Sequence, residues 1–312
     1  MTPTIGVFDS GFGGLTVLRA LVARAPQAQF AFIGDTARLP YGSKSRRTIA
    51  RYAAQSARFL VEEQGAEYLV IACNTASALA LDAIQEAVPS SVPVIGVIEP
   101  GAQAAQRASK TGDVLVIATD ATVHSHAYAA ACSALGLRAL EKACPLLVPL
   151  VEEGWTSADP FALLAPQASA AQAGPFPSQM AAQVLPQVAV TAEVLRIYLD
   201  ELNAEAASLG MHPDTLVLGC THYPLLKPLI QKAIPEGVRV IDSAESAADK
   251  LMMYLSPDLS QALRQDQAAP PPDAGDTVLR CFATDSVEKF ERLGSRFLGR
   301  PTGPVELVDL GG

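Results

Sequence analysis

The amino-acid sequence predicts an α/β protein made of two pseudo-symmetric domains, each a mainly parallel sheet flanked by helices. One observation is that short apolar runs with strand character alternate with segments of helical periodicity. Another is that residues 69–77 and 216–224 share one pattern: an apolar run, a small residue, a cysteine and then hydrogen-bonding side chains. Because ligands bind beyond the carboxyl ends of strands in open parallel sheets, we expect the active site in the cleft between the domains.

The first half is predicted to contain four strands separated by helices and polar loops. Its helices carry apolar residues three or four positions apart, as at Ile49, Ala53, Ala57 and Leu60. The strands are predicted at 5–8, 29–33, 69–71 and 93–98, and the helices at 15–25, 45–64 and 75–87. The glycine-rich loop 9–14 lacks the GxGxxG spacing of a dinucleotide site. The loop 34–42 is long for a connector, which leaves open whether it is a ligand flap or a surface excursion.

The second half repeats this order, beginning with a strand that enters a polar turn and a helix. Its strands are predicted at 113–119, 146–149, 216–218 and 238–242, and a helix at 190–209. Residues 160–186, rich in Ala, Pro, Gln and Ser, are predicted to form an insertion. After a mobile connection at 256–275, we expect an edge strand at 278–282 and a terminal helix at 286–297. The predicted domains are residues 1–98 with 243–312, and residues 99–242.

Composition and charge narrow the class of function. The formal net charge of -9 and the pI of about 5.0 argue against a surface for nucleic acid or anionic membrane. There is no apolar run of 18 residues and no signal-peptide pattern, so we expect a cytoplasmic protein without a membrane span. The five cysteines show no CxxC spacing, which predicts free thiols rather than a disulfide framework or a zinc site.

Cys73 and Cys220 stand at matching positions after two predicted strands, which packing alone does not explain. The other three cysteines fit small buried residues: Cys132, Cys144 and Cys281. A disulfide relay would need close sulfurs, and a cysteine hydrolase with His222 as base would leave Cys73 idle. Proton removal on one face of a carbon and return on the other would use both thiols. Helix N-termini behind the two cysteines are predicted to bias each toward the thiolate.

Six motifs occur in order along the chain: DSGFGG at 9–14, GDTARLPYG at 34–42, ACNTAS at 72–77, GVIEPG at 96–101, PLVEEG at 149–154 and GCTHYPLL at 219–226. Together they resemble glutamate racemase, of the cofactor-independent Asp/Glu racemase family, from residue 5 to about 255. Residues 282–299 resemble the family's C-terminus. The resemblance implies an isomerase that interconverts L- and D-glutamate, supplies D-glutamate for peptidoglycan, and uses neither PLP nor a metal.

Residue roles are implied by position within the matching motifs. Cys73 is implied to take the proton from D-glutamate and Cys220 the proton from L-glutamate, with Asp9, His222 and Glu152 supporting catalysis. Substrate-binding groups are implied at ten positions: Asp9, Ser10, Tyr41, Gly42, Asn74, Thr75, Thr119, Thr122, Thr221 and His222. Neutral donors of this kind suit a doubly charged anion that also carries an ammonium.

Several assignments have plainer alternatives. Asp9 fits a helix N-cap as well as a group that holds the ammonium or tunes Cys73. His222 could make a structural hydrogen bond instead of assisting Cys220. The sequence does not decide whether Glu152 or the adjacent Glu153 is the auxiliary acid, because a solvent-exposed position would explain a glutamate at either place.

Other functions remain to be weighed against glutamate racemisation. An aspartate racemase would use the same chemistry and differ by room for one methylene, worth about 1–3 kcal/mol; the six motifs favour glutamate. A non-catalytic binder of acidic amino acids or of a protein partner would not need two cysteines. The expected partner is therefore glutamate, without nucleic acid or membrane, and a homodimer is compatible with the resemblance. The insertion at 160–186 is longer than in the compact family pattern and lies remote in sequence from the six motifs.

Overall fold

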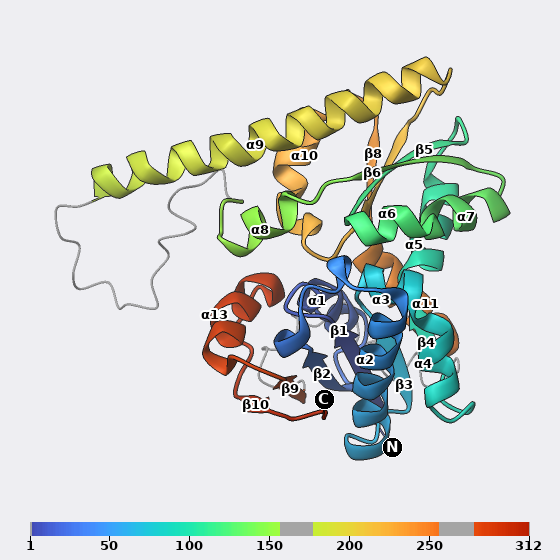
Figure 1. Cartoon of the computed structure of the whole chain (residues 1–312), viewed down its shortest axis with the longest axis vertical. Coiled ribbons are helices and arrows are strands. Elements are labelled where there is room, and N and C mark those ends of the chain that lie inside the picture. Colours follow the sequence, from blue (N-terminus) through green and yellow to red (C-terminus); the bar gives the residue numbers. More distant parts are fainter. Residues whose placement is uncertain (1, 157–176, 256–277, 312) are drawn as a thin grey trace.

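The computed structural model describes residues 2–156, 177–255 and 278–311, which form two parallel sheets with helices packed around them (Figure 1). The strands are β1 Thr4–Asp9, β2 Gln29–Gly34, β3 Tyr68–Ile71, β4 Val94–Gly96, β5 Asp113–Ala118, β6 Arg138–Ala143, β7 Thr215–Gly219, β8 Arg239–Asp242, β9 Leu279–Ala283 and β10 Val305–Leu307. The first sheet has the order β10-β9-β2-β1-β3-β4 and the second the order β6-β5-β7-β8. The strand pairings in both sheets are parallel.

The helices follow the strands in the alternation that the sequence predicts. They are α1 Leu15–Arg24, α2 Arg46–Arg58, α3 Asn74–Leu79, α4 Leu81–Ala87, α5 Ile98–Ala108, α6 Asp120–Ser125, α7 Ala127–Ala134, α8 Leu147–Glu152, α9 Pro177–Ser208, α10 Lys227–Ala233, α11 Ser243–Tyr254 and α13 Val287–Leu298. Short helical turns lie at η1 Thr36–Arg38, η2 Tyr41–Ser43, η3 Phe59–Glu63 and η4 Tyr223–Leu226. Within the described part of the chain, no helix is both long and apolar enough to cross a membrane.

The two sheets repeat one topology. The order β2-β1-β3-β4 in the first sheet corresponds to β6-β5-β7-β8 in the second, so β3 matches β7. Cys73 follows β3 and Cys220 follows β7, which gives the two cysteines equivalent places at the carboxyl ends of their sheets. The predicted fold class, with two similar parallel α/β halves, is confirmed.

Apolar strands buried on both faces explain why the sheets are covered by helices. β5 is buried along its whole length, and β1 is buried from Ile5 onward. Above the second sheet runs α9, the long yellow helix of Figure 1, whose Leu195, Leu199 and Leu202 are buried at helical spacing. One continuous core cluster extends from the first sheet through α1 and α11 into the second sheet. The halves are therefore joined by packed side chains as well as by the chain itself.

Several predicted elements are wrong or displaced. Residues 146–149 form the start of helix α8 and not a strand, because Leu147 and Val151 bury one helical face. The strand that pairs with β5 at this edge is β6, which the sequence analysis did not predict. The strand predicted at 93–98 ends at Gly96, and α5 begins at Ile98. The helix predicted at 75–87 is interrupted at Ala80, between α3 and α4.

The C-terminal part also differs from the prediction. The predicted edge strand at 278–282 is β9, and it is not at the edge, because β10 pairs with its outer side. The helix predicted at 190–209 begins earlier, at Pro177, inside the predicted insertion. The rest of that insertion, residues 160–176, and the connection predicted at 256–275 lie outside the described residues.

Candidate active site

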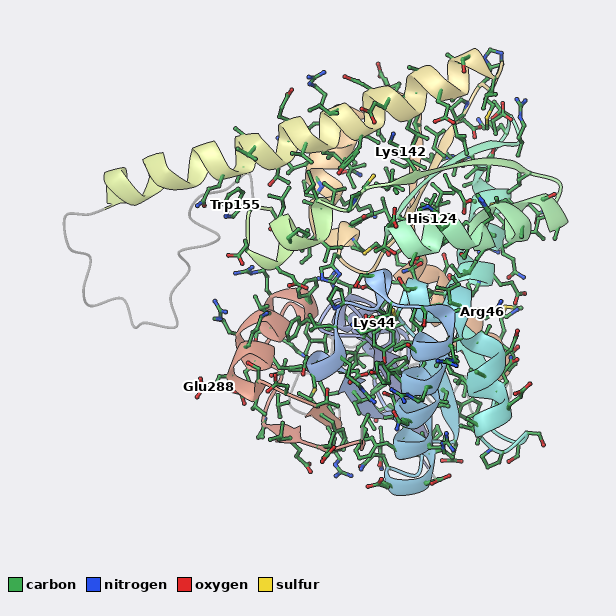
Figure 2. All side chains as sticks on the ribbon, viewed as in Figure 1. Lys44, Arg46, His124, Lys142, Trp155 and Glu288 are labelled. Atoms are coloured by element: carbon green, nitrogen blue, oxygen red, sulfur yellow. The ribbon has the colours of Figure 1, made fainter. Side chains whose placement is uncertain are left out.

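A cavity of about 540 Å³ lies where loops from the two halves meet. Its walls come from residues that follow β1, β2 and β3 in the first sheet and β5, β6 and β7 in the second. Both candidate thiols, Cys73 and Cys220, line it. Figure 2 shows Lys44, before α2, and His124, on α6, on opposite sides of the boundary between the halves.

Most of the residues that the sequence predicts for the site line this one cavity: Ser10, Tyr41, Gly42, Cys73, Asn74, Thr75, Thr119, Glu152, Cys220, Thr221 and His222. Asp9 and Thr122 are not part of the lining. Both are buried directly behind it, within contact of residues that do line the cavity. The predicted set is therefore brought together in space, with these two residues in the layer behind the cavity wall.

Cys73 is the N-cap residue of α3 and is almost completely buried. Its thiol donates to Ser10 Oγ at 3.4 Å, and its Sγ accepts from the Ala76 backbone N–H at 3.4 Å. Burial, followed by the nearby Asp9 carboxylate, raises the pKa of Cys73 to about 12. The backbone N–H of Ala76, at the start of α3, lowers this pKa in the predicted direction, but burial and Asp9 outweigh it and favour the thiol.

Cys220 has a different neighbourhood, built around a histidine. Its Sγ lies 3.9 Å from His222 Nδ1, and His222 Nε2 lies 3.1 Å from Glu152 Oε1. Burial lowers the pKa of His222, but the contacts with Cys220 and Glu152 outweigh it and raise this pKa to about 10. Burial raises the pKa of Glu152, and the hydrogen bond with His222 prevails and holds it below the usual value. The geometry thus places an imidazolium beside Cys220.

The structure separates the two adjacent glutamates that the sequence leaves unresolved. Glu152 lines the cavity and contacts His222, whereas Glu153 is exposed. The ring of Phe297, on α13, packs edge-on against His222 with centroids 5.0 Å apart. Arg296 Nη1 donates to the Glu152 carbonyl oxygen at 3.4 Å. The C-terminal helix therefore supports the Glu152–His222 pair from the first half.

Asp9 lies between the two cysteine environments. Its Oδ2 accepts from the Gly11 backbone N–H at 2.9 Å, and among the described residues its buried Oδ1 has no hydrogen-bond partner. Burial raises the pKa of Asp9, an effect opposed mainly by the charge of His222. Asp9 does not act as the alternative N-cap, because the N-terminal residue of α1 is capped by no side chain. Its carboxylate instead acts electrostatically on Cys73.

Three threonine hydroxyls gather where the halves meet. Thr119 Oγ1 lies 3.1 Å from Thr75 Oγ1 and 2.9 Å from Thr122 Oγ1, and the Thr75 and Thr122 hydroxyls are 3.4 Å apart. Thr75 lies in the first turn of α3, whereas Thr119 and Thr122 belong to the turn and helix after β5. Hydroxyls can each donate and accept, so this cluster can turn its protons toward a carboxylate.

The loop after β2 closes another side of the cavity and is held from behind. The Tyr41 hydroxyl donates to Asp35 Oδ2 at 2.5 Å, and Arg38 Nε lies 2.9 and 2.8 Å from the two oxygens of Asp35. Thr284 Oγ1, after β9, donates to Asp35 Oδ1 at 2.9 Å. The Tyr41 hydroxyl thus points to Asp35, while Leu39, Tyr41 and Gly42 of this loop line the cavity. It is a wall of the site and not a surface excursion.

Gly13 allows the first half to approach the second cysteine loop. A Cβ at Gly13 would lie 2.2 Å from Thr221 Oγ1 and 2.6 Å from His222 Nδ1. Thr16 Oγ1 donates across the same contact to the Thr221 carbonyl oxygen at 3.0 Å. The glycine-rich loop therefore serves close packing at this boundary.

Sequence reasoning missed an apolar wall of the cavity formed by Pro145, Val148 and Pro149. Val148 and Pro149 fall in the segment 146–149 predicted as a strand, and Pro145 directly precedes it. The four-residue spacing of Leu147 and Val151 was the available signal for a helix. It also missed further lining residues on the other loops: Gly11, Leu39, Pro40, Ser43 and Asp120.

Comparison with known proteins identifies the family. The family model described as Asp/Glu/Hydantoin racemase matches residues 5–174. The glutamate racemase of Koribacter versatilis is 50% identical, covering 99% of this chain and 98% of the relative, and that of Geobacter metallireducens is 41% identical, covering 98% and 96%. Among solved structures, glutamate racemase isoform RacE1 from Bacillus anthracis is 34% identical with a TM-score of 0.77, covering 99% and 98%. The enzyme of Francisella tularensis in complex with D-glutamate is 32% identical with a TM-score of 0.76, again covering 99% and 98%. The chain thus belongs to the glutamate racemases, within the Asp/Glu/Hydantoin racemase family.

Proposed function

We propose that this chain interconverts L- and D-glutamate by proton transfer at Cα between two thiols, Cys73 and Cys220. The observation that carries this proposal is that both thiols line one cavity but have neighbours of opposite charge, Asp9 beside Cys73 and His222 beside Cys220. A two-base reaction needs one group to act as acid while the other acts as base. With Asp9 beside one thiol and His222 beside the other, two cysteines can take these opposite roles.

In the L-to-D direction, the Cys220 sulfur takes the Cα proton and the electron pair of the C–H bond stays on the substrate, delocalised into the carboxylate. The Cys73 thiol then gives its proton to the opposite face of Cα and is left as a thiolate. The raised pKa of Cys73 supports this role, because it favours a thiol that holds its proton until the transfer. The Cys73 thiolate that remains is the base that accepts a proton from D-glutamate, so the reverse reaction uses the same steps in the opposite order.

The substrate charges have neutral hydrogen-bond donors as partners in this proposal. Asn74 and the threonine hydroxyls bind carboxylate oxygens, with the backbone of Gly42 and the Ser10 hydroxyl on other sides of the cavity. Asp9 and the Glu152–His222 pair set the charge beside each thiol and so support catalysis. Glutamate is preferred to aspartate as the substrate because the relatives above 30% identity bear the name glutamate racemase.

The cellular setting follows from the proposed product. D-glutamate made here would supply peptidoglycan synthesis, and free thiols at Cys73 and Cys220 suit the reducing cytoplasm. The net charge of -9 supports the absence of nucleic acid among the partners. We propose residues 1–98 with 243–312 and residues 99–242 as the two domains, which agrees with the grouping of the strands into two sheets, and a homodimer as the assembly.

Deuterium exchange tests the mechanism directly. Incubation with L-glutamate in heavy water should give D-glutamate that carries deuterium at Cα, without added cofactor. Cys73→Ala and Cys220→Ala should each lower kcat by about a thousandfold or more, since each removes a proton-transfer group. Cys132→Ala is the matched control, because Cys132 is buried on α7 away from the cavity lining. Full turnover in either active-site variant would refute the two-thiol mechanism.

A further inference from the structure

Tyr128 joins the second half to the first half beside the reacting cysteine. It lies on α7, is fully buried, and its hydroxyl donates to Asn74 Oδ1 at 2.7 Å. Asn74 directly follows Cys73 and lines the cavity. Tyr128 itself does not line the cavity, and its hydrogen bond to the Asn74 amide links it to a residue that does.

Two glycines leave room for the Tyr128 ring. A Cβ at Gly219 would lie 2.9 Å from the ring carbon Cε2, and a Cβ at Gly101 would lie 3.2 Å from Cε1. Gly219 is the small residue before Cys220, and Gly101 lies in α5. The ring therefore fills a slot between the second cysteine strand and a helix, and this slot fixes where its hydroxyl points.

The hydrogen bond also decides which end of the Asn74 amide is free. The Tyr128 hydroxyl donates to Oδ1, and burial raises the pKa of Tyr128, so the hydroxyl keeps the proton that this bond uses. The other amide atom, Asn74 Nδ2, is buried and has no hydrogen-bond partner among the described residues. An unsatisfied buried donor is unfavourable, and an acceptor oxygen on a bound ligand would satisfy it. A reversed amide would offer an oxygen to an anionic substrate and repel it.

We propose that Tyr128 is a positioning residue that fixes the Asn74 amide with its acceptor toward α7 and its donor toward a substrate carboxylate. This inference rests on the proposed function of the cavity as a glutamate site. According to this proposal, α7 affects substrate affinity although none of its residues lines the cavity. It also explains the glycine before Cys220, because a side chain there would displace the tyrosine.

The test is Tyr128→Phe, which keeps the ring and removes the hydroxyl. We expect KM for L-glutamate to rise about tenfold, as for loss of one hydrogen bond to a charged group, while kcat changes less than threefold. In an Asn74→Ala background, the same substitution should change KM less than twofold, because its effect passes through the Asn74 amide. Tyr223→Phe is the matched control: its buried hydroxyl donates to the carbonyl oxygens of Ala118 and Cys144, so we expect a lower Tm with KM within twofold of wild type.

Two results would overturn the proposal: a wild-type KM in Tyr128→Phe, or an equal rise in KM with and without Asn74. Calorimetric titration with D-glutamate gives the same comparison as a ratio of Kd values, whether or not the protein turns over. If the wild type binds glutamate but exchanges no proton, the proposed function fails while the role of Tyr128 is still decided by these Kd ratios. If the wild type does not bind glutamate, both fail.

Discussion

Replacing Gly13 by alanine tests whether Thr221 and His222 must stand where the structure places them. The added Cβ would lie 2.2 Å from Thr221 Oγ1 and 2.6 Å from His222 Nδ1, whereas ordinary contacts begin at 3.4 Å. One or both side chains must therefore move by roughly 1 Å, since the new methyl is fixed to the backbone. His222 is the group beside Cys220, so its displacement should disturb proton transfer at that thiol.

A misplacement of about 1 Å in a catalytic site lowers the rate by about 100-fold. We therefore expect kcat/KM of Gly13→Ala for L-glutamate to fall about 100-fold. The rate of racemisation can be measured by circular dichroism of the reaction mixture. Gly112→Ala is the control, because φ there is 78° and no described atom lies within 4 Å of the added Cβ. That change should lower the free energy of unfolding by about 1 kcal/mol and leave kcat/KM unchanged. More than half of the wild-type kcat/KM in Gly13→Ala would show that the tight boundary does not set the position of His222.

Three further outcomes are expected. Glu152→Gln removes a carboxylate that helps to raise the pKa of His222 to about 10, so the alkaline fall of kcat/KM should move to lower pH. Glu153 is exposed, and Glu153→Gln should keep the wild-type profile; identical profiles for both variants would contradict the assignment of Glu152. The pKa of His222 is higher in the folded state than the ordinary histidine pKa of 6.5, so its contribution to stability is complete below pH 6.5 and is lost as pH rises through about 10. Urea unfolding at pH 6.5 and pH 10 should show this loss in the wild type and not in His222→Asn. Asp35→Asn breaks the buried ion pair between Asp35 and Arg38 behind Tyr41, which should lower the free energy of unfolding by about 3–5 kcal/mol. It should also raise KM for L-glutamate, because Asp35 holds the Tyr41 loop in place. An unchanged KM would show that the Tyr41 loop does not take part in substrate binding.

Strands with a buried apolar sequence could be predicted from that sequence alone. Strands that are extended only because they pair with a neighbouring strand could not. β5 is a continuous apolar run and reads as a strand by itself. β6, with the sequence RALEKA, is half-buried and polar, and it becomes a strand because all six of its residues pair with β5. β10 has three residues and is extended because it pairs with β9. No local pattern announces either strand.

The same distinction separates the predicted from the unpredicted parts of the site. Cys73, Asn74, Cys220 and their polar neighbours follow apolar strands directly, so their place at a sheet edge could be inferred from the sequence. The contact of Gly13 with Thr221 and the hydrogen bond of Tyr128 to Asn74 join residues far apart in the chain. Such contacts exist only after both halves have folded and packed, and the sequence carries no spacing that predicts them.

The asymmetry of the two thiols arises in the loops and not in the sheets. The repeated strand order places Cys73 and Cys220 at equivalent strand ends, which gives two sulfurs access to one cavity. The equivalent sheets do not decide which sulfur holds a proton. Asp9, the last residue of β1, adds a negative charge near Cys73, whereas the residue two positions after Cys220 is His222, paired with Glu152 after β6. A duplicated scaffold with identical loops would give the two thiols the same charged neighbours, and nothing in it would favour one as the acid and the other as the base. The differences between the loops therefore supply what the symmetry of the fold lacks: one sulfur ready to donate and another placed beside a positive charge.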